Sequence, residues 1–284
     1  MKKIIRFLIF VFIVALVYVS FSVAPPFVTK TLVRQSHQLT ITGHRGAAGL
    51  APENTLPSIN EALKYNVDRV EIDVRQTKDG ALVLMHDTTL DRTTDGSGYV
   101  HEHNLEAVRK LDAGSWFSAK YSETKIPTLK EAIEAVKGKS ELLIEIKEGN
   151  WMYPGIEQNV VDLIHEYDLQ DSIIVQSFYD DVLFRIHEID PDIRLHKLFI
   201  ADTPFFHYDA DGFRFIKFDR YEIVEEFSIM HHFASNRFLK KAKSMGKKVN
   251  VWTIRSEKKG QKYIKMNVDG LITDYPNYFT ETKD

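Results

Sequence analysis

The chain has 284 residues, of which 44% are hydrophobic and 27% are charged, so it is long enough for one large globular domain or two small ones. Its net charge of −3 and isoelectric point near 6.4 leave no basic surplus, which argues against nucleic-acid binding driven by phosphate neutralisation. The absence of cysteine excludes disulfides, thiolate zinc sites and a cysteine nucleophile, and it leaves the redox compartment open.

The first 29 residues are predicted to be a membrane anchor. Residues 7–24 are uncharged, and as a helix they span roughly 27 Å at about 1.5 Å per residue. Lys2, Lys3 and Arg6 precede this run, which favours a cytoplasmic N-terminus, with the globular part of the chain, residues 30–284, outside the cell. The alternative is a cleaved signal peptide and a secreted protein, although Pro25, directly after the small residues at 22–24, disfavours a cut there.

From residue 39 onward, strand-like apolar runs alternate with amphipathic helical patterns. Strands are predicted at 39–42, 69–74, 82–85, 141–146, 172–176, 194–200, 248–253 and 270–273, and a further strand is placed only loosely within 201–235. Helices are predicted to begin after an N-cap at Thr55 and at 128–137, 156–167, 180–189, 236–245 and 257–266. This alternation over about 240 residues predicts a (β/α)8 barrel rather than an open sheet. Residues 87–126, rich in Thr, Gly, Ser and aromatics, form a long insertion with one short helical pattern at 105–111.

Chemically active side chains fall at or just past the ends of these strands. Active sites of barrels lie at the C-terminal ends of the strands, so these side chains are expected to meet at one mouth. They are His44, Arg45, Glu71, Asp73, His86, Glu145, Lys147, Phe178, Trp252 and Asp274.

Three acidic residues are predicted to bind a metal ion. Glu71 and Asp73 lie two apart on one strand, so they point to the same side. Two buried carboxylates repel each other, and a divalent cation relieves that cost; oxygen ligands suit Ca²⁺ or Mg²⁺ better than zinc. Glu145 interrupts an apolar strand and is the natural third ligand. A solvated strand edge is the alternative, which the apolar residues around Glu71 and Asp73 disfavour.

Two histidines are candidates for acid–base catalysis, because imidazoles titrate near neutral pH. His44 and His86 would deprotonate an attacking hydroxyl and protonate a leaving alkoxide. Arg45 offers a planar fork and Lys147 a point charge for phosphate oxygens. Either cation is alternatively a counter-ion of the acidic cluster, and both roles are compatible.

Three further residues have open roles. Glu53 either orients His44 or Arg45, or it only adds charge at a helix N-terminus. Phe178 and Trp252 form either an apolar wall for a small alcohol group or part of the ordinary core.

In their residues and in their order along the chain, these motifs resemble those of the glycerophosphodiester phosphodiesterase family, which has a phospholipase-C-like TIM barrel. The resemblance covers about residues 40–280. The matching motifs are Gly43-His44-Arg45-Gly46, Pro52-Glu53-Asn54-Thr55, Glu71-Ile72-Asp73, His86-Asp87, Leu90-Asp91-Arg92-Thr93-Thr94, Ile126-Pro127-Thr128-Leu129, Glu145-Ile146-Lys147, Val251-Trp252-Thr253 and Thr273-Asp274-Tyr275-Pro276.

The resemblance implies a TIM barrel with a small insertion after the second strand. It implies metal-dependent hydrolysis of glycerophosphodiesters to sn-glycerol 3-phosphate and an alcohol, with the glycerol 2-hydroxyl as an internal nucleophile. His44 would be the proton acceptor and His86 the proton donor. The metal ligands would be Glu71, Asp73 and Glu145, and the phosphate contacts Arg45 and Lys147.

Two other functions remain alternatives. The predicted anchor and the Trp116-Phe117 pair suit a lysophospholipase D acting on lysophospholipids. An inert, anchored phosphoester-binding module is the other alternative, and the intact histidines argue against it. The sequence leaves the alcohol, the choice between Ca²⁺ and Mg²⁺, and the oligomeric state open.

Overall fold

The structure is a computed structural model that describes residues 39–202, 207–209, 212–214 and 218–282. The predicted N-terminal anchor, residues 1–29, lies outside the described residues. Within the described part of the chain, we find no helix with the length and apolar character needed to span a bilayer.

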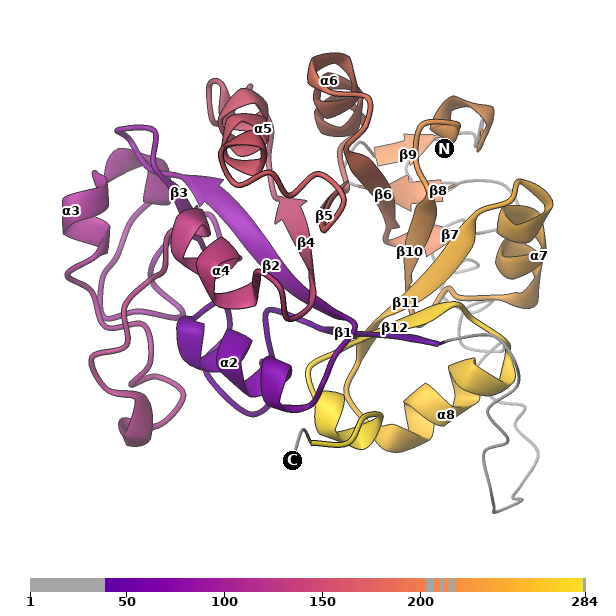
Figure 1. The fold of residues 1–284 in the computed structure, drawn as a ribbon, viewed down its shortest axis with the longest axis horizontal. Helices are drawn as coiled ribbons and strands as arrows, with labels where there is room; N and C mark the ends of the chain where they lie inside the picture. The colour runs from indigo at the N-terminus through magenta and orange to yellow at the C-terminus, as the bar shows by residue number, and fades with distance from the viewer. Residues whose placement is uncertain (1–38, 203–206, 210–211, 215–217, 283–284) are drawn as a thin grey trace, which may run out of the picture. The chain divides into compact units, whose positions relative to one another are not determined.

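Eight parallel strands close into a barrel (Figure 1), as the sequence predicted. β1 pairs with both β2 and β12, and these pairings close the ring. The order around the barrel is β1, β2, β4, β5, β6, β10, β11 and β12. Their bounds are β1 Thr40–Gly43, β2 Arg69–Gln76, β4 Glu141–Ile146, β5 Ile173–Ser177, β6 Arg194–Phe199, β10 Glu226–Met230, β11 Lys248–Ile254 and β12 Gly270–Thr273.

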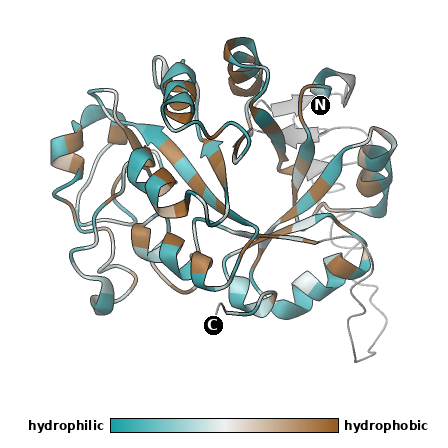
Figure 2. Ribbon diagram, in the orientation of Figure 1, coloured by the Kyte–Doolittle hydropathy of each residue, from teal (hydrophilic) through white to brown (hydrophobic). Residues whose placement is uncertain are grey.

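Helices lie on the outside of the barrel, with α5 and α6 at the top of Figure 1 and α8 at the bottom. They are α2 (Leu56–Lys64), α4 (Leu129–Val136), α5 (Ile156–Glu166), α6 (Asp180–Ile189), α7 (Asn236–Ser244) and α8 (Glu257–Lys265). Hydrophilic and hydrophobic residues alternate along them (Figure 2), and their apolar stripes pack into the main core around the sheet. Thr55 caps α2 as predicted, because its side chain accepts a hydrogen bond from the Ser58 N–H.

The run at 82–85 departs from the predicted alternation. Its strand, β3 (Leu82–Leu84), is antiparallel to β2 and outside the ring, because the chain turns back between Thr77 and Ala81 through Gly80, whose φ is +84°. The segment that follows contains η1 (Val100–Glu102), α3 (Leu105–Val108) and η2 (Ala119–Tyr121). It has its own small core, made of Val83, Met85, Leu90, Val100, Val108, Ala113 and Ile126.

The loosely placed strand is β10, and a small antiparallel sheet precedes it. That sheet contains β7 (Ala201–Asp202), β8 (His207–Asp209) and β9 (Gly212–Arg214); η3 (Phe218–Tyr221) follows, and η4 (Pro276–Tyr278) lies after β12. β10 lacks the apolar run of a buried parallel strand because Glu226 and Ser228 alternate with its apolar residues, and both are buried.

Candidate active site

Three carboxylates meet at the C-terminal end of the barrel, as the sequence predicted. Glu71 and Asp73 come from β2 and Glu145 from β4, and the parallel register pairs Asp73 with Glu145. One oxygen of each lies within 4.8 Å of the others, and all three residues are buried, Asp73 completely. Adjacent parallel strands therefore place three acidic groups within reach of one cation.

The charges of this cluster are only partly balanced by the protein. Lys147 Nζ lies 2.6 Å from Glu145 Oε1 and 3.5 Å from Asp73 Oδ1, while Arg45 Nε lies 3.3 Å from Asp73 Oδ2. Among the described residues, Glu71 has no ion pair: it accepts hydrogen bonds from the Arg45 N–H at 2.8 Å and the Gln176 amide at 3.4 Å. Two cations are thus shared among three acids, and Glu71 is the acid without a cationic partner among the described residues.

The pKa values of the three acids differ accordingly. Burial, with the charges of Asp73 and Glu145, raises the pKa of Glu71 well above its ordinary value. Burial also raises the pKa of Glu145, although Lys147 opposes it. For Asp73 burial acts in the same direction, but Lys147 and Arg45 outweigh it and hold the pKa far below the ordinary value. A divalent cation would lower the pKa of all three, and Asp73 Oδ1, which is buried without a hydrogen bond, points to the same ligand.

The loop after β1 supports these acids. Asn54 donates to Asp73 Oδ2 at 2.7 Å and accepts from the Asp73 N–H at 3.0 Å. Arg45 and Asn54 both have positive φ, of 50° and 55°. At Gly46, where φ is +81°, a Cβ atom would lie 2.5 Å from the Ser58 backbone, so this tight turn requires glycine.

His44 is held by a partner that the sequence marked only as a strand-end residue. Its Nδ1 lies 2.5 Å from Asp274 Oδ1, just after β12, and both side chains are buried. Arg255 donates to the other oxygen of Asp274. Burial and then Arg45 lower the pKa of His44, against the opposing effect of Asp274, so the imidazole is neutral near pH 7. With a proton on Nδ1 facing Asp274, Nε2 is left free to accept one.

His86 follows β3 and is also held by an acid. Its Nδ1 lies 2.7 Å from Asp87 Oδ1, and Arg75 donates to the His86 carbonyl, at 3.1 Å from Nε. Burial lowers the pKa of His86 to about 4; Lys147 and Arg45 add to this effect, while Asp73 and Asp87 oppose it. The structure therefore gives each predicted histidine a carboxylate partner.

Glu53, whose role the sequence left open, contacts Arg45. Its Oε1 accepts a 2.7 Å hydrogen bond from Arg45 Nη1, and a second arginine, Arg92, binds both of its oxygens. Glu53 thus orients Arg45, and His44 has Asp274 instead.

The two predicted aromatic residues lie beside Lys147. The Phe178 and Trp252 rings make an edge contact with centroids 5.5 Å apart, and Lys147 Nζ lies 5.9 Å from the Phe178 centroid. Both residues are only partly buried, so neither is a fully enclosed core residue.

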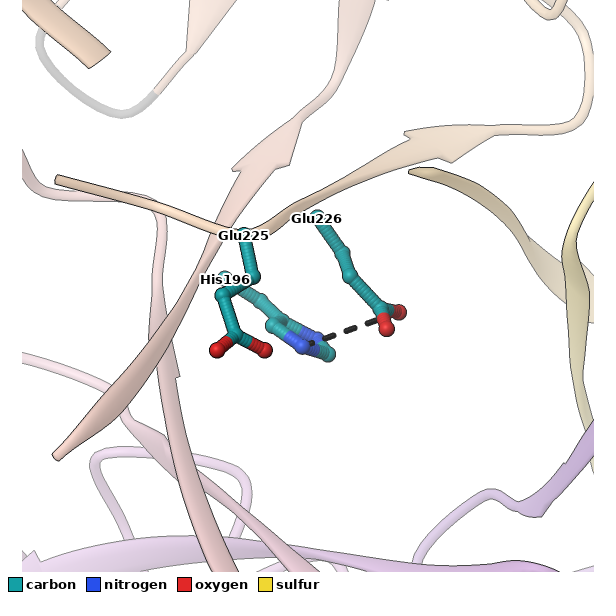
Figure 3. A group of neighbouring side chains, drawn as sticks. All are labelled: His196, Glu225 and Glu226. Atoms are coloured by element: carbon teal, nitrogen blue, oxygen red, sulfur yellow. Dashed lines mark ion pairs between the residues drawn. The ribbon is translucent and has the colours of Figure 1, made fainter. Parts of the chain in front are cut away.

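A second cluster with metal-ligand side chains, drawn in Figure 3, lies near the N-terminal ends of β6 and β10 and is better explained as structural. His196 Nε2 lies 3.6 Å from Glu226 Oε2, and Glu225 is close by. Glu226 already accepts two hydrogen bonds from Arg69, at 2.8 and 3.1 Å, and Glu225 pairs with Arg194 at 3.1 Å. These acids are neutralised by arginines, so the cluster closes the base of the barrel rather than binding a cation.

The fold and the acid-rich mouth define a TIM-barrel phosphodiesterase. The chain belongs to the glycerophosphoryl diester phosphodiesterase family, whose model matches residues 44–278. It is a phosphoric diester hydrolase, in agreement with the sequence resemblance.

Relatives and solved structures agree with this assignment. The chain is 35% identical over 240 residues to the glycerophosphodiester phosphodiesterase of Caldanaerobacter subterraneus, covering 83% of this chain and 94% of the relative. It is 30% identical over 287 residues to that of Bacillus subtilis, covering 96% of each. A phosphodiesterase from Oleispira antarctica, solved in complex with the product sn-glycerol-3-phosphate, superposes with a TM-score of 0.75 at 30% identity, covering 84% of this chain and 93% of that chain. The Agrobacterium tumefaciens enzyme superposes with a TM-score of 0.71 at 26% identity, covering 85% and 99%.

Proposed function

We propose that this protein is a metal-dependent glycerophosphodiester phosphodiesterase that releases sn-glycerol 3-phosphate and an alcohol. Its substrates would be glycerophosphodiesters such as glycerophosphocholine, glycerophosphoethanolamine or glycerophosphoglycerol. The family membership supports the reaction, and the product bound to the Oleispira relative supports the glycerophosphate half of the substrate. The observation that carries the proposal is the meeting of three buried carboxylates with two acid-paired histidines at one barrel mouth.

Glu71, Asp73 and Glu145 would hold one Ca²⁺ or Mg²⁺. When bound, the cation supplies charge neutralisation and polarises a phosphoryl oxygen of the diester. Arg45 and Lys147 already contact Asp73, so they lie where an anionic phosphate beside the acids would be recognised. In this arrangement they serve both as counter-ions and as phosphate contacts.

His44 is suited to the proton acceptor role. It is neutral near pH 7, and Asp274 favours the tautomer with a free Nε2. Nε2 would take the proton of the attacking glycerol 2-hydroxyl as the cyclic phosphate forms. Asp274 would then stabilise the imidazolium. When water opens that ring, His86 would accept the proton of the water and His44 would return its proton to the 2-hydroxyl.

His86 is suited to the proton donor role once a diester is bound. Its low pKa reflects burial next to Lys147 and Arg45. The negative charge of a bound phosphodiester would offset part of the effect of those two cations and favour protonated His86, which would then donate to the leaving alkoxide. Asp87, 2.7 Å from His86 Nδ1, would hold the ring in place.

Phe178 and Trp252 would provide an apolar wall for the organic part of the substrate, since the two residues are only partly buried and Phe178 lies beside Lys147. We propose that residues 1–29 anchor the enzyme in the cell membrane with the catalytic domain outside, or are cleaved to release it. Either location would give it deacylated phospholipids outside the cell as substrates.

The Asp274→Asn substitution is expected to lower kcat by about 10²-fold or more, because the amide can no longer hold the productive tautomer or stabilise the imidazolium. Asp274 opposes the lowering of the pKa of His44, so its loss lowers that pKa further and moves the acid limb of the pH profile to lower pH. The matched control is Asp190→Asn, which removes a similar 2.7 Å contact to the surface residue His165. An acid limb that stays in place would contradict the role of Asp274.

Treatment with EDTA is expected to abolish turnover, and added Ca²⁺ or Mg²⁺ is expected to restore it. The physical reason is that Glu71 has no cationic partner among the described residues, so diester binding beside it requires a cation. Release of glycerol 3-phosphate, followed with and without chelator, measures this. Turnover that persists in EDTA would remove the metal from the proposal.

A substrate panel tests the function itself. The full chain is assayed with the three glycerophosphodiesters and with lysophosphatidylcholine, and glycerol 3-phosphate and lysophosphatidic acid are followed as products. Glycerol 3-phosphate is the expected product. Preferential release of lysophosphatidic acid would favour the lysophospholipase D alternative, and the absence of any turnover would favour the binding module.

A further inference from the structure

Arg92, in the segment between β3 and α4, makes bidentate hydrogen bonds to two carboxylates at the edge of the site. Its Nη1 and Nη2 donate to Glu53 Oε2 and Oε1 at 3.0 and 2.7 Å. Its Nε and Nη2 donate to Asp87 Oδ2 and Oδ1 at 2.6 and 3.1 Å. One guanidinium therefore binds two carboxylates through both oxygens of each, which a lysine ammonium cannot do.

Each of these carboxylates holds a residue of the proposed machinery. Asp87 binds His86 Nδ1 at 2.7 Å, and Glu53 binds Arg45 Nη1 at 2.7 Å. His86 and Arg45 lie on different loops, His86 just after β3 and Arg45 just after β1. Arg92 thus connects the proposed proton donor to the proposed phosphate contact through one acid on each side.

Electrostatics agree with this geometry. The hydrogen bonds from Arg92 lower the pKa of Asp87, and with Arg45 they lower the pKa of Glu53 against the effect of its burial. Both acids are therefore ionised near neutral pH and accept hydrogen bonds from both of their neighbours.

We infer that Arg92 is a positioning residue that holds His86 and Arg45 in their working orientations through Asp87 and Glu53. The inference rests on the proposed function. It explains the Leu90–Thr94 motif, because Arg92 belongs to it. Arg92 itself need not touch the substrate.

The test is Arg92→Lys, which keeps the positive charge but cannot make the bidentate hydrogen bonds to Glu53 and Asp87. Its control is Arg109→Lys in the same segment, because Arg109 makes a comparable fork to Glu131, at 2.9 and 2.7 Å, with a similar side-chain exposure, 35% against 43%. Both variants of the full chain are assayed with glycerophosphocholine and with a p-nitrophenyl diester of glycerol phosphate, whose leaving group needs no proton. Thermal unfolding and Ca²⁺ binding are measured in parallel.

For Arg92→Lys we expect kcat/KM on glycerophosphocholine to fall about 10- to 100-fold, the scale of a small misplacement of catalytic groups. The loss on the p-nitrophenyl ester should be smaller, since His86 matters less there, and Ca²⁺ binding and unfolding should match those of Arg109→Lys. Equal activity of the two lysine variants would overturn the inference, as would equal losses on both esters. If the wild-type chain releases no glycerol 3-phosphate, the proposed function fails instead.

Discussion

Replacing Glu71 with alanine is expected to abolish cation binding and turnover together, whereas His44→Ala is expected to abolish turnover and keep the cation. Glu71 has a carboxylate oxygen within 4.8 Å of those of Asp73 and Glu145, so its loss leaves two acids that already pair with Arg45 and Lys147. His44 has Asp274 as its carboxylate partner, so its removal should lower the rate by about 10²- to 10⁴-fold without changing the ion site.

Calorimetric titration with Ca²⁺ and an assay of glycerol 3-phosphate release separate these two effects. Glu166→Ala is a suitable control, because Glu166 is an exposed glutamate on α5 paired with Lys130. Loss of Ca²⁺ binding in both Glu71→Ala and His44→Ala would show that the assigned roles are wrong. Retained binding in Glu71→Ala would exclude this residue as a ligand.

The second large effect is expected for His86→Ala, and its size should depend on the leaving group. With glycerophosphocholine the rate should fall by about 10²- to 10⁴-fold, because the choline alkoxide must be protonated as it leaves. With a p-nitrophenyl ester the fall should be much smaller, because that anion is stable. His165→Ala, which removes a surface histidine paired with Asp190, provides the control.

Equal losses on the two esters would contradict the assignment of His86 as proton donor. Unchanged turnover of both esters would show that His86 takes no part in the reaction. Comparing kcat values at saturating substrate keeps the test independent of any change in phosphate binding.

Much of the barrel could be predicted from the sequence because its strands are short apolar runs with clear ends. The strand at Glu141–Ile146, the helix at Asp180–Ile189 and the strand at Gly270–Thr273 have the predicted bounds. The N-cap at Thr55 is confirmed as well, since capping depends on neighbouring residues only. The direction of the strand at 82–85 was harder to predict from the sequence, because it depends on the hairpin turn that pairs this strand with β2.

The site was partly predictable for a similar reason. Strand alternation puts Glu71 and Asp73 on one side, and the barrel register brings Glu145 to them. The partners of the histidines were not predictable, because Asp274 is 230 positions from His44 and meets it only when β1 pairs with β12. The role of Glu53 likewise depended on the position of Arg92 in three dimensions.

β10 could be placed only loosely from the sequence because the base of the barrel is polar. Glu226 on this strand is buried and pairs with Arg69 across the barrel, so a strand with a buried acid does not look apolar in the sequence. A buried charge of this kind is stable only with its partner, and the partner lies on β2, 157 positions earlier.

The most direct measurement is a crystal structure of the full chain with Ca²⁺ and sn-glycerol 3-phosphate, using anomalous scattering to locate the ion. We predict one ion shared by Glu71, Asp73 and Glu145, with the phosphate beside Arg45 and Lys147 and between the two histidines. An ion at His196 and Glu226 instead, or a phosphate bound away from His44 and His86, would contradict this account.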